Sequence, residues 1–412
     1  MTAESRMWKL AVLATLVLLL AVSAGCIGGP DTVASRDIVV LKLNADGVVQ
    51  WTKTIDTGQD DGAEDLVELP GGGFAIAAQN GSDPRHPARP RFIRLSPDGT
   101  VLWDQFVTEG ADIARAVVPV GNGGTAVLTG NGTVVRYDPA GQPLWATATG
   151  IPWAHALAPT TDGGLVAGGH VTYYTNTTIT IPPVPGASTL PDPARFVAGE
   201  EGIAARLSAD GGIVWERGYG ENGLDHVRLL AESPDLTGLL IVGDGAMPDA
   251  NWTADVPLLA IPLALDGMPL ATAQLGAAAF PVAVRTEPAG YRVLYWTARP
   301  TADVHGGAVV DALLDRDGRA LERRFLNASS AVTWTPEGGY FSVGIPLGGG
   351  ASGYVTMTME GTSASTFRAL LFDSTGALMW DHALPTGLMS QAKKVVQTAD
   401  GGYAVLALRT NE

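Results

Sequence analysis

The sequence predicts an all-β fold, a seven-bladed β-propeller built from four-stranded antiparallel blades. Two markers recur seven times each along the chain, and short strands rich in Val, Ile, Leu and aromatic residues run between them. No stretch has a sustained helical period. Four strands repeated about every fifty-four residues are typical of a propeller blade.

The first marker is a turn glycine followed four residues later by tryptophan. It occurs five times, at Gly47/Trp51, Gly99/Trp103, Gly141/Trp145, Gly211/Trp215 and Gly376/Trp380. Two further turns, Asp266-Gly267 and Asp317-Gly318, keep the Asp-Gly pair and lose the tryptophan. Seven hairpins are therefore expected.

The second marker is a tight glycine turn that opens a β-rich run, once after each hairpin. Its copies begin at Gly72, Gly123, Gly163, Thr237, Ala289, Gly338 and Gly401. Glycine supplies the positive φ that short hairpin turns require. Because two independent markers give the same count, the sequence predicts seven blades.

Two hairpin segments, Asp138–Trp145 and Asp373–Trp380, resemble the tryptophan-docking (PQQ-like) repeat of the quinoprotein-dehydrogenase-like propellers: Asp, two residues, Gly, three residues, Trp. The resemblance extends from Arg36 to the end of the chain. It implies that the Asp-x-x-Gly turn joins the third strand to the fourth and that the inner strand follows the tryptophan. Quinone-binding members use a vicinal disulfide, which a chain with one cysteine cannot form. We therefore expect the repeat without a cofactor.

The ends of the predicted propeller, residues 36–412, belong to one blade. The chain enters on a third strand, Asp37–Leu43, and leaves on a second strand, Tyr403–Leu408. An open ring would expose strand edges. We therefore expect a closing blade with two strands from each terminus.

The N-terminus has the pattern of an export signal. Arg6 and Lys9 precede an apolar run, Leu10–Val22, which is short for a spanning helix. The stretch VSAGC resembles the lipobox of secreted lipoproteins, which implies a signal peptide over 1–25, a lipid on Cys26 and a linker over 26–35. The alternative is an uncleaved signal anchor. Both interpretations place residues 27 onward on the outer side of the cell membrane.

Asparagine and charge support an exported surface protein. Five of the nine asparagines begin an Asn-x-Ser/Thr sequon and are candidate glycosylation sites: Asn80, Asn131, Asn176, Asn251 and Asn327. The net charge of −16, with five lysines, argues against nucleic acid as a partner. The single cysteine leaves stability to packing rather than to an internal disulfide.

One face of the ring is predicted to carry function. Both glycine turns of each blade lie on one face, so the second-to-third and fourth-to-first links lie on the other, which we call the loop-bearing face. The long links and the sequons fall there, and function on repeat rings concentrates where loops have grown. The expected long links are Gln79–Arg91, His170–Gly202, Ala246–Pro257, Ala298–Gly307 and Ile345–Phe367.

The starts of the first strands approach the channel mouth on this face. Aligned by blade they provide a polar collar of candidate binding residues: Asp65, Arg115, His155, His226 and Lys393, with apolar Val282 and Ala331 in the other two blades. Such a collar suits a small anionic or polyhydroxy ligand, and a water-filled channel explains it equally well. An acidic cluster of Asp60, Asp61, Glu64 and Asp65 is a weak candidate for calcium.

No Gly-x-Ser-x-Gly elbow, His-Glu-x-x-His pair, phosphate loop or Cys-x-x-Cys motif occurs. We therefore expect a monomeric, non-catalytic surface lipoprotein whose loop-bearing face binds an envelope protein or a surface glycan. The alternative is a hydrolase or lyase acting on polysaccharide at the channel mouth. Its acid–base pair would be Asp65 with His155 or His226.

Overall fold

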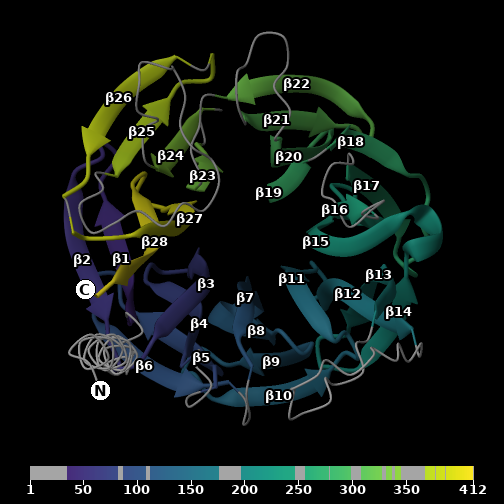
Figure 1. Ribbon diagram of the computed structural model, residues 1–412, viewed down its shortest axis with the longest axis horizontal. Coiled ribbons are helices and arrows are strands. Elements are labelled where there is room, and N and C mark those ends of the chain that lie inside the picture. Colours follow the sequence, from purple (N-terminus) through teal and green to yellow (C-terminus); the bar gives the residue numbers. More distant parts are fainter. Residues whose placement is uncertain are drawn as a thin grey trace, which may run out of the picture.

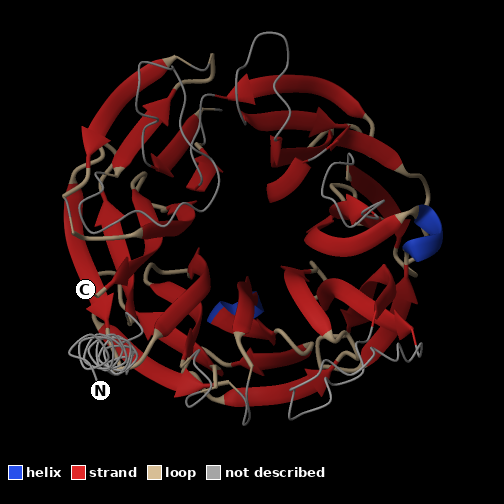
Figure 2. Cartoon of the chain, in the orientation of Figure 1, coloured by secondary structure: helices blue, strands red, loops and turns tan. Residues whose placement is uncertain are grey.

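The computed structural model describes residues 35–81, 87–107, 112–175, 196–245, 256–277, 279–297, 308–326, 331–335, 339–344, 367–375, 377–385 and 387–411. Over these residues the chain forms seven four-stranded antiparallel sheets arranged in a ring (Figure 1). Figure 2 shows strands throughout, with two short 3₁₀ turns, η1 (Gly121–Gly123) and η2 (Gly220–Asn222). The predicted seven-bladed propeller is confirmed.

The blades follow one another along the chain, each running from its innermost to its outermost strand. Blade 1 contains β3 (Asp61–Glu68), β4 (Phe74–Asn80), β5 (Arg89–Leu95) and β6 (Val101–Phe106). Blade 2 contains β7 (Ala114–Val120), β8 (Gly124–Thr129), β9 (Thr133–Tyr137) and β10 (Pro143–Ala148). Blade 3 contains β11 (Trp153–Pro159), β12 (Leu165–Thr175), β13 (Phe196–Leu207) and β14 (Ile213–Gly218).

The second half of the ring repeats this pattern. Blade 4 contains β15 (Leu224–Glu232), β16 (Gly238–Gly245), β17 (Pro257–Ala264) and β18 (Ala273–Ala277). Blade 5 contains β19 (Ala279–Glu287), β20 (Gly290–Thr297), β21 (Ala308–Leu314) and β22 (Ala320–Leu326). Blade 6 contains β23 (Ala331–Trp334), β24 (Tyr340–Gly344), β25 (Arg368–Phe372) and β26 (Leu378–Ala383).

Blade 7 closes the ring with two strands from each end of the chain, as predicted. Its order is β2 (Val49–Ile55), β1 (Arg36–Leu43), β28 (Tyr403–Thr410) and β27 (Gln391–Gln397). β1 and β28 pair antiparallel over their full length, from Arg36↔Thr410 to Leu43↔Tyr403. Figure 1 shows the purple N-terminal strands beside the yellow C-terminal ones. The ladder satisfies backbone groups that an open ring would leave at its edges.

The tryptophans of the first marker pack between blades. Each ring covers the turn glycine of the next blade: Trp51 on Gly99, Trp103 on Gly141, Trp145 on Gly211, Trp215 on Gly267, and Trp380 on Gly47. A Cβ added at these glycines would lie 2.5 to 2.9 Å from the indole. The spacing of the motif therefore reflects a blade-to-blade contact that also crosses the closure.

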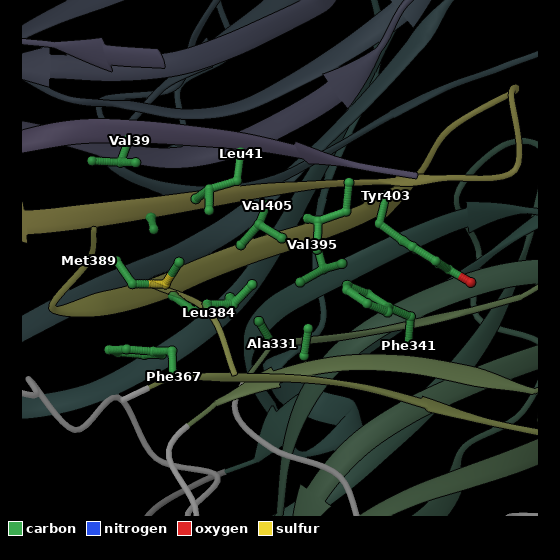
Figure 3. Close-up of a cluster of buried hydrophobic side chains, with 14 residues drawn as sticks. Val39, Leu41, Ala331, Phe341, Phe367, Leu384, Met389, Val395, Tyr403 and Val405 are labelled. Carbon is green, nitrogen blue, oxygen red and sulfur yellow. The ribbon is translucent and has the colours of Figure 1, made fainter. Parts of the chain in front are cut away.

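The hydrophobic core lies between neighbouring blades. The cluster in Figure 3 joins blade 6 to blade 7, and within it the rings of Phe341 and Tyr403 stack with their centroids 3.8 Å apart. Val39 and Leu41 of β1 and Val405 of β28 are completely buried in the same cluster. At about 25 cal/mol for each Å² of apolar surface buried, such interfaces between blades are the main source of stability.

Two predicted links are shorter by several residues. In place of the link predicted over Gln79–Arg91, β4 extends to Asn80 and β5 begins at Arg89. The sequence predicted a link from His170 to Gly202, but β12 continues to Thr175 and β13 begins at Phe196. The extra residues pair across the two strands, from Val171↔Glu201 to Thr175↔Phe196. Backbone hydrogen bonds thus extend the hairpin of β12 and β13 past the ends of the other two strands of the blade. His170 lies in a strand rather than in a loop.

Candidate functional site

The innermost strands carry a recurring irregularity near their starts. In each of six of them, within the part of the chain that the structure describes, the register shifts by one residue near the loop-bearing face. The extra residues are Glu64, Arg115, His155, Val282 and Lys393 in five of these strands, and β15 of blade 4 has two shifts, at Asp225 and at Arg228. Such β-bulges re-aim side chains and are common next to functional sites. Five of these blades therefore present one re-aimed side chain toward the mouth, and blade 4 presents two.

These bulges refine the predicted collar. Arg115, His155 and Lys393 are bulge residues, as is apolar Val282. In blade 1 the bulge residue is Glu64 rather than Asp65, and in blade 4 the bulge residues are Asp225 and Arg228 rather than His226. Asp65 and His226 still lie on innermost strands, one position further along. In those two blades the residues expected from sequence lie next to a bulge rather than in it, because a bulge inserts a residue without altering the apparent alternation.

Charged collar residues of blades 7 and 1 pair across the blade boundary. Lys393 Nζ lies 3.2 Å from Glu64 Oε2, and Lys394 Nζ lies 3.0 Å from Asp65 Oδ1. Asp65 Oδ2 also accepts a hydrogen bond from the backbone N–H of Val117 at 3.0 Å. Within the described residues Asp65 thus bonds to these groups, not to His155 or His226. A cavity of about 370 Å³ opens beside Lys393 and Lys394.

Blades 3 and 4 gather three histidines, which we call the histidine cluster: His155, His170 and His226. His155 Nε2 lies 3.2 Å from His170 Nδ1, and these two rings are stacked with their centroids 5.2 Å apart. His226 approaches His170 edge-on, with a centroid distance of 4.3 Å. The first strand of each blade and the second strand of blade 3 supply these residues at the end that faces the loop-bearing face.

Two carboxylates contact the histidine cluster. His226 Nε2 lies 3.1 Å from Glu200 Oε2, and His226 Nδ1 lies 2.7 Å from Asp244 Oδ2. Asp244 is nearly buried, and Arg228 Nε donates to its Oδ1 at 2.7 Å. Burial alone would raise the pKa of Asp244, but the hydrogen bonds from His226 and Arg228 hold it well below its usual range. Asp244 is therefore an ionised, fixed partner for the imidazole.

The remaining ionisable groups here are also perturbed. Burial, with the charges of Arg228 and Arg115, lowers the pKa of His155 to about 3. Burial, with the charges of His226 and Arg228, lowers the pKa of His170 to about 4. Burial raises the pKa of Asp225 to about 6, assisted by Glu200 and Asp244 and opposed by His226. Both histidines are therefore neutral imidazoles at neutral pH, each with one N–H donor and one acceptor nitrogen.

A cavity of about 450 Å³ opens beside the histidine cluster, between blades 2 and 3. Among its lining residues are Asp112, Arg115, Asn131 and Trp153. Trp153 is 48% exposed, and one face of its ring stacks on His170 with an interplanar angle of 11°. The Nε of Arg115 is buried without a hydrogen-bond partner in the described part of the chain. The cavity thus combines an aromatic surface with polar groups that a ligand can contact.

The acidic cluster considered for calcium has other partners. Arg36 donates to both oxygens of Asp60, and Asp61 pairs with Arg91 at 2.7 Å. Asp65 pairs with Lys394. Each of these carboxylates is directed to its own cation, and among the described residues they do not form a converging group of the kind calcium requires. Calcium binding here stays a prediction.

Two of the five sequons lie in the described residues. Asn80 is the last residue of β4 and is half-buried. Asn131 is exposed in the turn between β8 and β9, where its Oδ1 accepts a hydrogen bond from the hydroxyl of Thr133 at 3.0 Å. Asn176, Asn251 and Asn327 lie outside the described residues. Whether any of them carries a glycan stays a prediction.

The sequence indicates His155 and His226 as site residues but does not indicate their partners His170, Glu200 and Asp244. His170 and Glu200 lie within the link predicted over His170–Gly202, and Asp244 is the penultimate residue of a strand that shows no motif. The available signal was the position of polar residues at the ends of second strands and the starts of third strands. Antiparallel pairing brings those ends to the same face as the starts of the first strands.

No protein-family model matches this sequence, and no curated protein matches it either. None of the helical segments in the described residues has the length and apolar character needed to cross a membrane. The fold and the site therefore define the protein as a seven-bladed β-propeller with a polar, histidine-containing mouth.

Proposed function

We propose that this chain is an exported, lipid-anchored propeller that binds a surface glycan through its loop-bearing face and does not catalyse a reaction. The observation that carries the proposal is the cavity lined by Asp112, Arg115, Asn131 and Trp153. A concave site with an aromatic wall and a few convergent polar groups is typical of small-ligand recognition.

The lining chemistry favours a polyhydroxylated ligand. An exposed indole such as that of Trp153 offers a flat apolar surface on which the C–H face of a sugar ring can lie. Arg115 supplies donors and Asp112 supplies an acceptor for ring hydroxyls. Because the Nε of Arg115 lacks a partner, a ligand oxygen there would satisfy a buried donor.

The membrane attachment and the repeat family are parts of the same proposal. The lipobox-like VSAGC sequence supports lipidation of Cys26, and the sequons support an outer location. The contacts of Trp145 and Trp380 with turn glycines support kinship with the tryptophan-docking (PQQ-like) propellers. Of that family's properties, only the repeat is part of the proposal, and the quinone cofactor is not.

The alternative function is hydrolysis or elimination of polysaccharide at the same mouth. The observation that favours it is Asp225, whose pKa is raised to about 6 by burial beside His226. A carboxyl group in that range can donate a proton near neutral pH. Incubation of the protein with envelope polysaccharide, followed by assay for new reducing ends and for unsaturated uronate, distinguishes a binder from an enzyme.

The binding proposal is tested by calorimetric titration of the full chain, solubilised in detergent, with neutral and anionic oligosaccharides prepared from envelope polysaccharide. We expect saturable binding of at least one class and no cleavage. Absence of saturable binding to every oligosaccharide would overturn the proposal. The R115A variant is expected to lose about tenfold or more in affinity, since about 1.4 kcal/mol corresponds to tenfold.

A further inference from the structure

We infer that His170, Glu200 and His226 form a zinc site joining blades 3 and 4. One potential ligand atom from each side chain lies within 4.8 Å of the others. Among the described residues this is the one group of three His, Cys, Asp or Glu side chains that converges in this way. Two imidazole nitrogens and a carboxylate are a donor set that zinc accepts in proteins, whereas calcium and magnesium prefer oxygen alone.

The distances fit a shared ion. Two ligand atoms that are each about 2.1 Å from a tetrahedral zinc ion lie roughly 3.4 Å apart. Glu200 Oε2 and His226 Nε2 are separated by 3.1 Å, which is close to this ligand-to-ligand distance. The three side chains are only partly buried, which leaves room for the rotations that would bring the full set from its 4.8 Å limit to ligand distances.

The surroundings of His226 are those of a metal ligand. Its Nδ1 faces Asp244 Oδ2 at 2.7 Å, and Arg228 holds Asp244 in place. Histidines that bind metals almost always donate their other N–H to a carboxylate, carbonyl or water, which fixes the tautomer and directs the lone pair at the ion. A tautomer that carries its proton on Nδ1, beside Asp244, leaves the lone pair on Nε2, which lies 3.1 Å from Glu200 Oε2.

Charge also favours a cation at this position. A neutral imidazole has one N–H, yet His226 has a carboxylate at each nitrogen. If Nδ1 donates to Asp244, the lone pair of Nε2 faces the carboxylate of Glu200, which is repulsive. A zinc ion between these atoms replaces the repulsion with two bonds; the competing explanation is an imidazolium without metal.

The proposed ion has two consequences. Three protein ligands leave a coordination position for water or for an added ligand, as in zinc sites that are not purely structural. The ligands come from β12, β13 and β15, so the ion connects two blades and stabilises the folded ring by mass action. The inference is independent of the glycan-binding proposal, since none of these three residues lines the cavity beside Trp153.

The test is calorimetric titration of the chelator-stripped full chain with zinc chloride, paired with thermal unfolding. Wild type is expected to bind one equivalent, and zinc is expected to raise its Tm. E200Q, which preserves side-chain shape, and H170A, a second variant, should each lose at least about 100-fold in affinity and lose the Tm increase. D244N should lose about 10- to 100-fold because it disturbs orientation rather than ligation.

The matched control is H382A, which removes a histidine from β26 and should bind zinc as wild type does. Cobalt substituted for zinc should give the intense visible absorption of a tetrahedral site in wild type and lose it in E200Q. Failure of wild type to bind zinc, or equal affinity of wild type, E200Q and H170A, would overturn the inference. The first result would leave the imidazolium explanation.

Discussion

The ammonium nitrogen of Lys42 lies 2.9 Å from both carboxylate oxygens of Asp400, 358 positions further along the chain. Lys42 belongs to β1, and Asp400 lies in the turn that opens β28. The lysine side chain is 6% exposed, and its ammonium nitrogen also donates to the carbonyl of Leu43 at 3.1 Å. The contact adds a charge-assisted bond to the ladder that closes the ring.

Deletion of residues 399–412 is expected to abolish cooperative unfolding near the wild-type Tm. The deletion removes β28, which pairs with both β1 and β27 and contributes Tyr403 and Val405 to the core between blades 6 and 7. Calorimetry checks the result, and deletion of Glu412 alone is the control. A truncated protein that melts like wild type would show that the ring does not need its closing strand.

The Asp400 carboxylate is expected to make stability depend on acid pH. Burial would raise its pKa, but hydrogen bonds from Thr398 and Lys42 lower it from 3.8 to about 2. A pKa that is lower in the folded state stabilises the fold above about pH 4, and this stabilisation is lost as the pH falls toward 2. D400N should therefore lower Tm by about 1–3 °C at pH 7.

The difference in Tm between D400N and wild type should narrow between pH 4 and pH 2 as wild-type Asp400 takes up its proton. Thermal unfolding across this range measures it. A gap that stays constant with pH would mean that the carboxylate charge makes no contribution to closure.

W145A is expected to destabilise the ring by about 2 kcal/mol, less than the 3–5 kcal/mol typical of fully buried tryptophan because Trp145 is only partly buried. The indole packs on Gly211 of the next blade, and its Nε1 donates to the carbonyl of Ala209 at 3.1 Å. Chemical denaturation measures the loss. The control is L144A, because Leu144 is the adjacent residue and is 59% exposed. This substitution should change the free energy of unfolding by less than about 0.5 kcal/mol. Equal destabilisation by W145A and L144A would contradict tryptophan docking.

C26S is expected to move the protein from the detergent-rich phase to the aqueous phase after detergent phase separation of cells. The reason is that a thioether-linked lipid needs the cysteine sulfur, whereas an uncleaved apolar anchor does not. Incorporation of a labelled fatty acid into wild type and not into C26S gives a second readout. Retention of C26S in the detergent-rich phase would favour the uncleaved anchor.

The ring could be predicted from sequence because its signals are local. A turn glycine and the tryptophan four residues later, as in Gly141 and Trp145, report hairpin geometry within a few positions. The count of such hairpins gives the number of blades. Closure followed from the identity of the first and last strands, because an exposed edge is unfavourable.

The site could be predicted only in part because it depends on contacts between blades. His226 meets Glu200 only after blades 3 and 4 lie side by side, and the strand extension that carries Glu200 looked like part of a loop. The bulges at Glu64, Asp225 and Arg228 are near the expected residues rather than at them, and no alternation of side chains reveals an inserted residue.

The central claim is that the loop-bearing face binds a glycan beside the histidine cluster, and Trp153 tests it most directly. The measurement is the equilibrium affinity of wild type and W153A for the envelope oligosaccharide that binds best. The control is F280A, since Phe280 is a similarly exposed aromatic residue near the start of a first strand, stacked on Trp296. We predict a loss of about tenfold or more for W153A and none for F280A; unchanged affinity of W153A would contradict the claim.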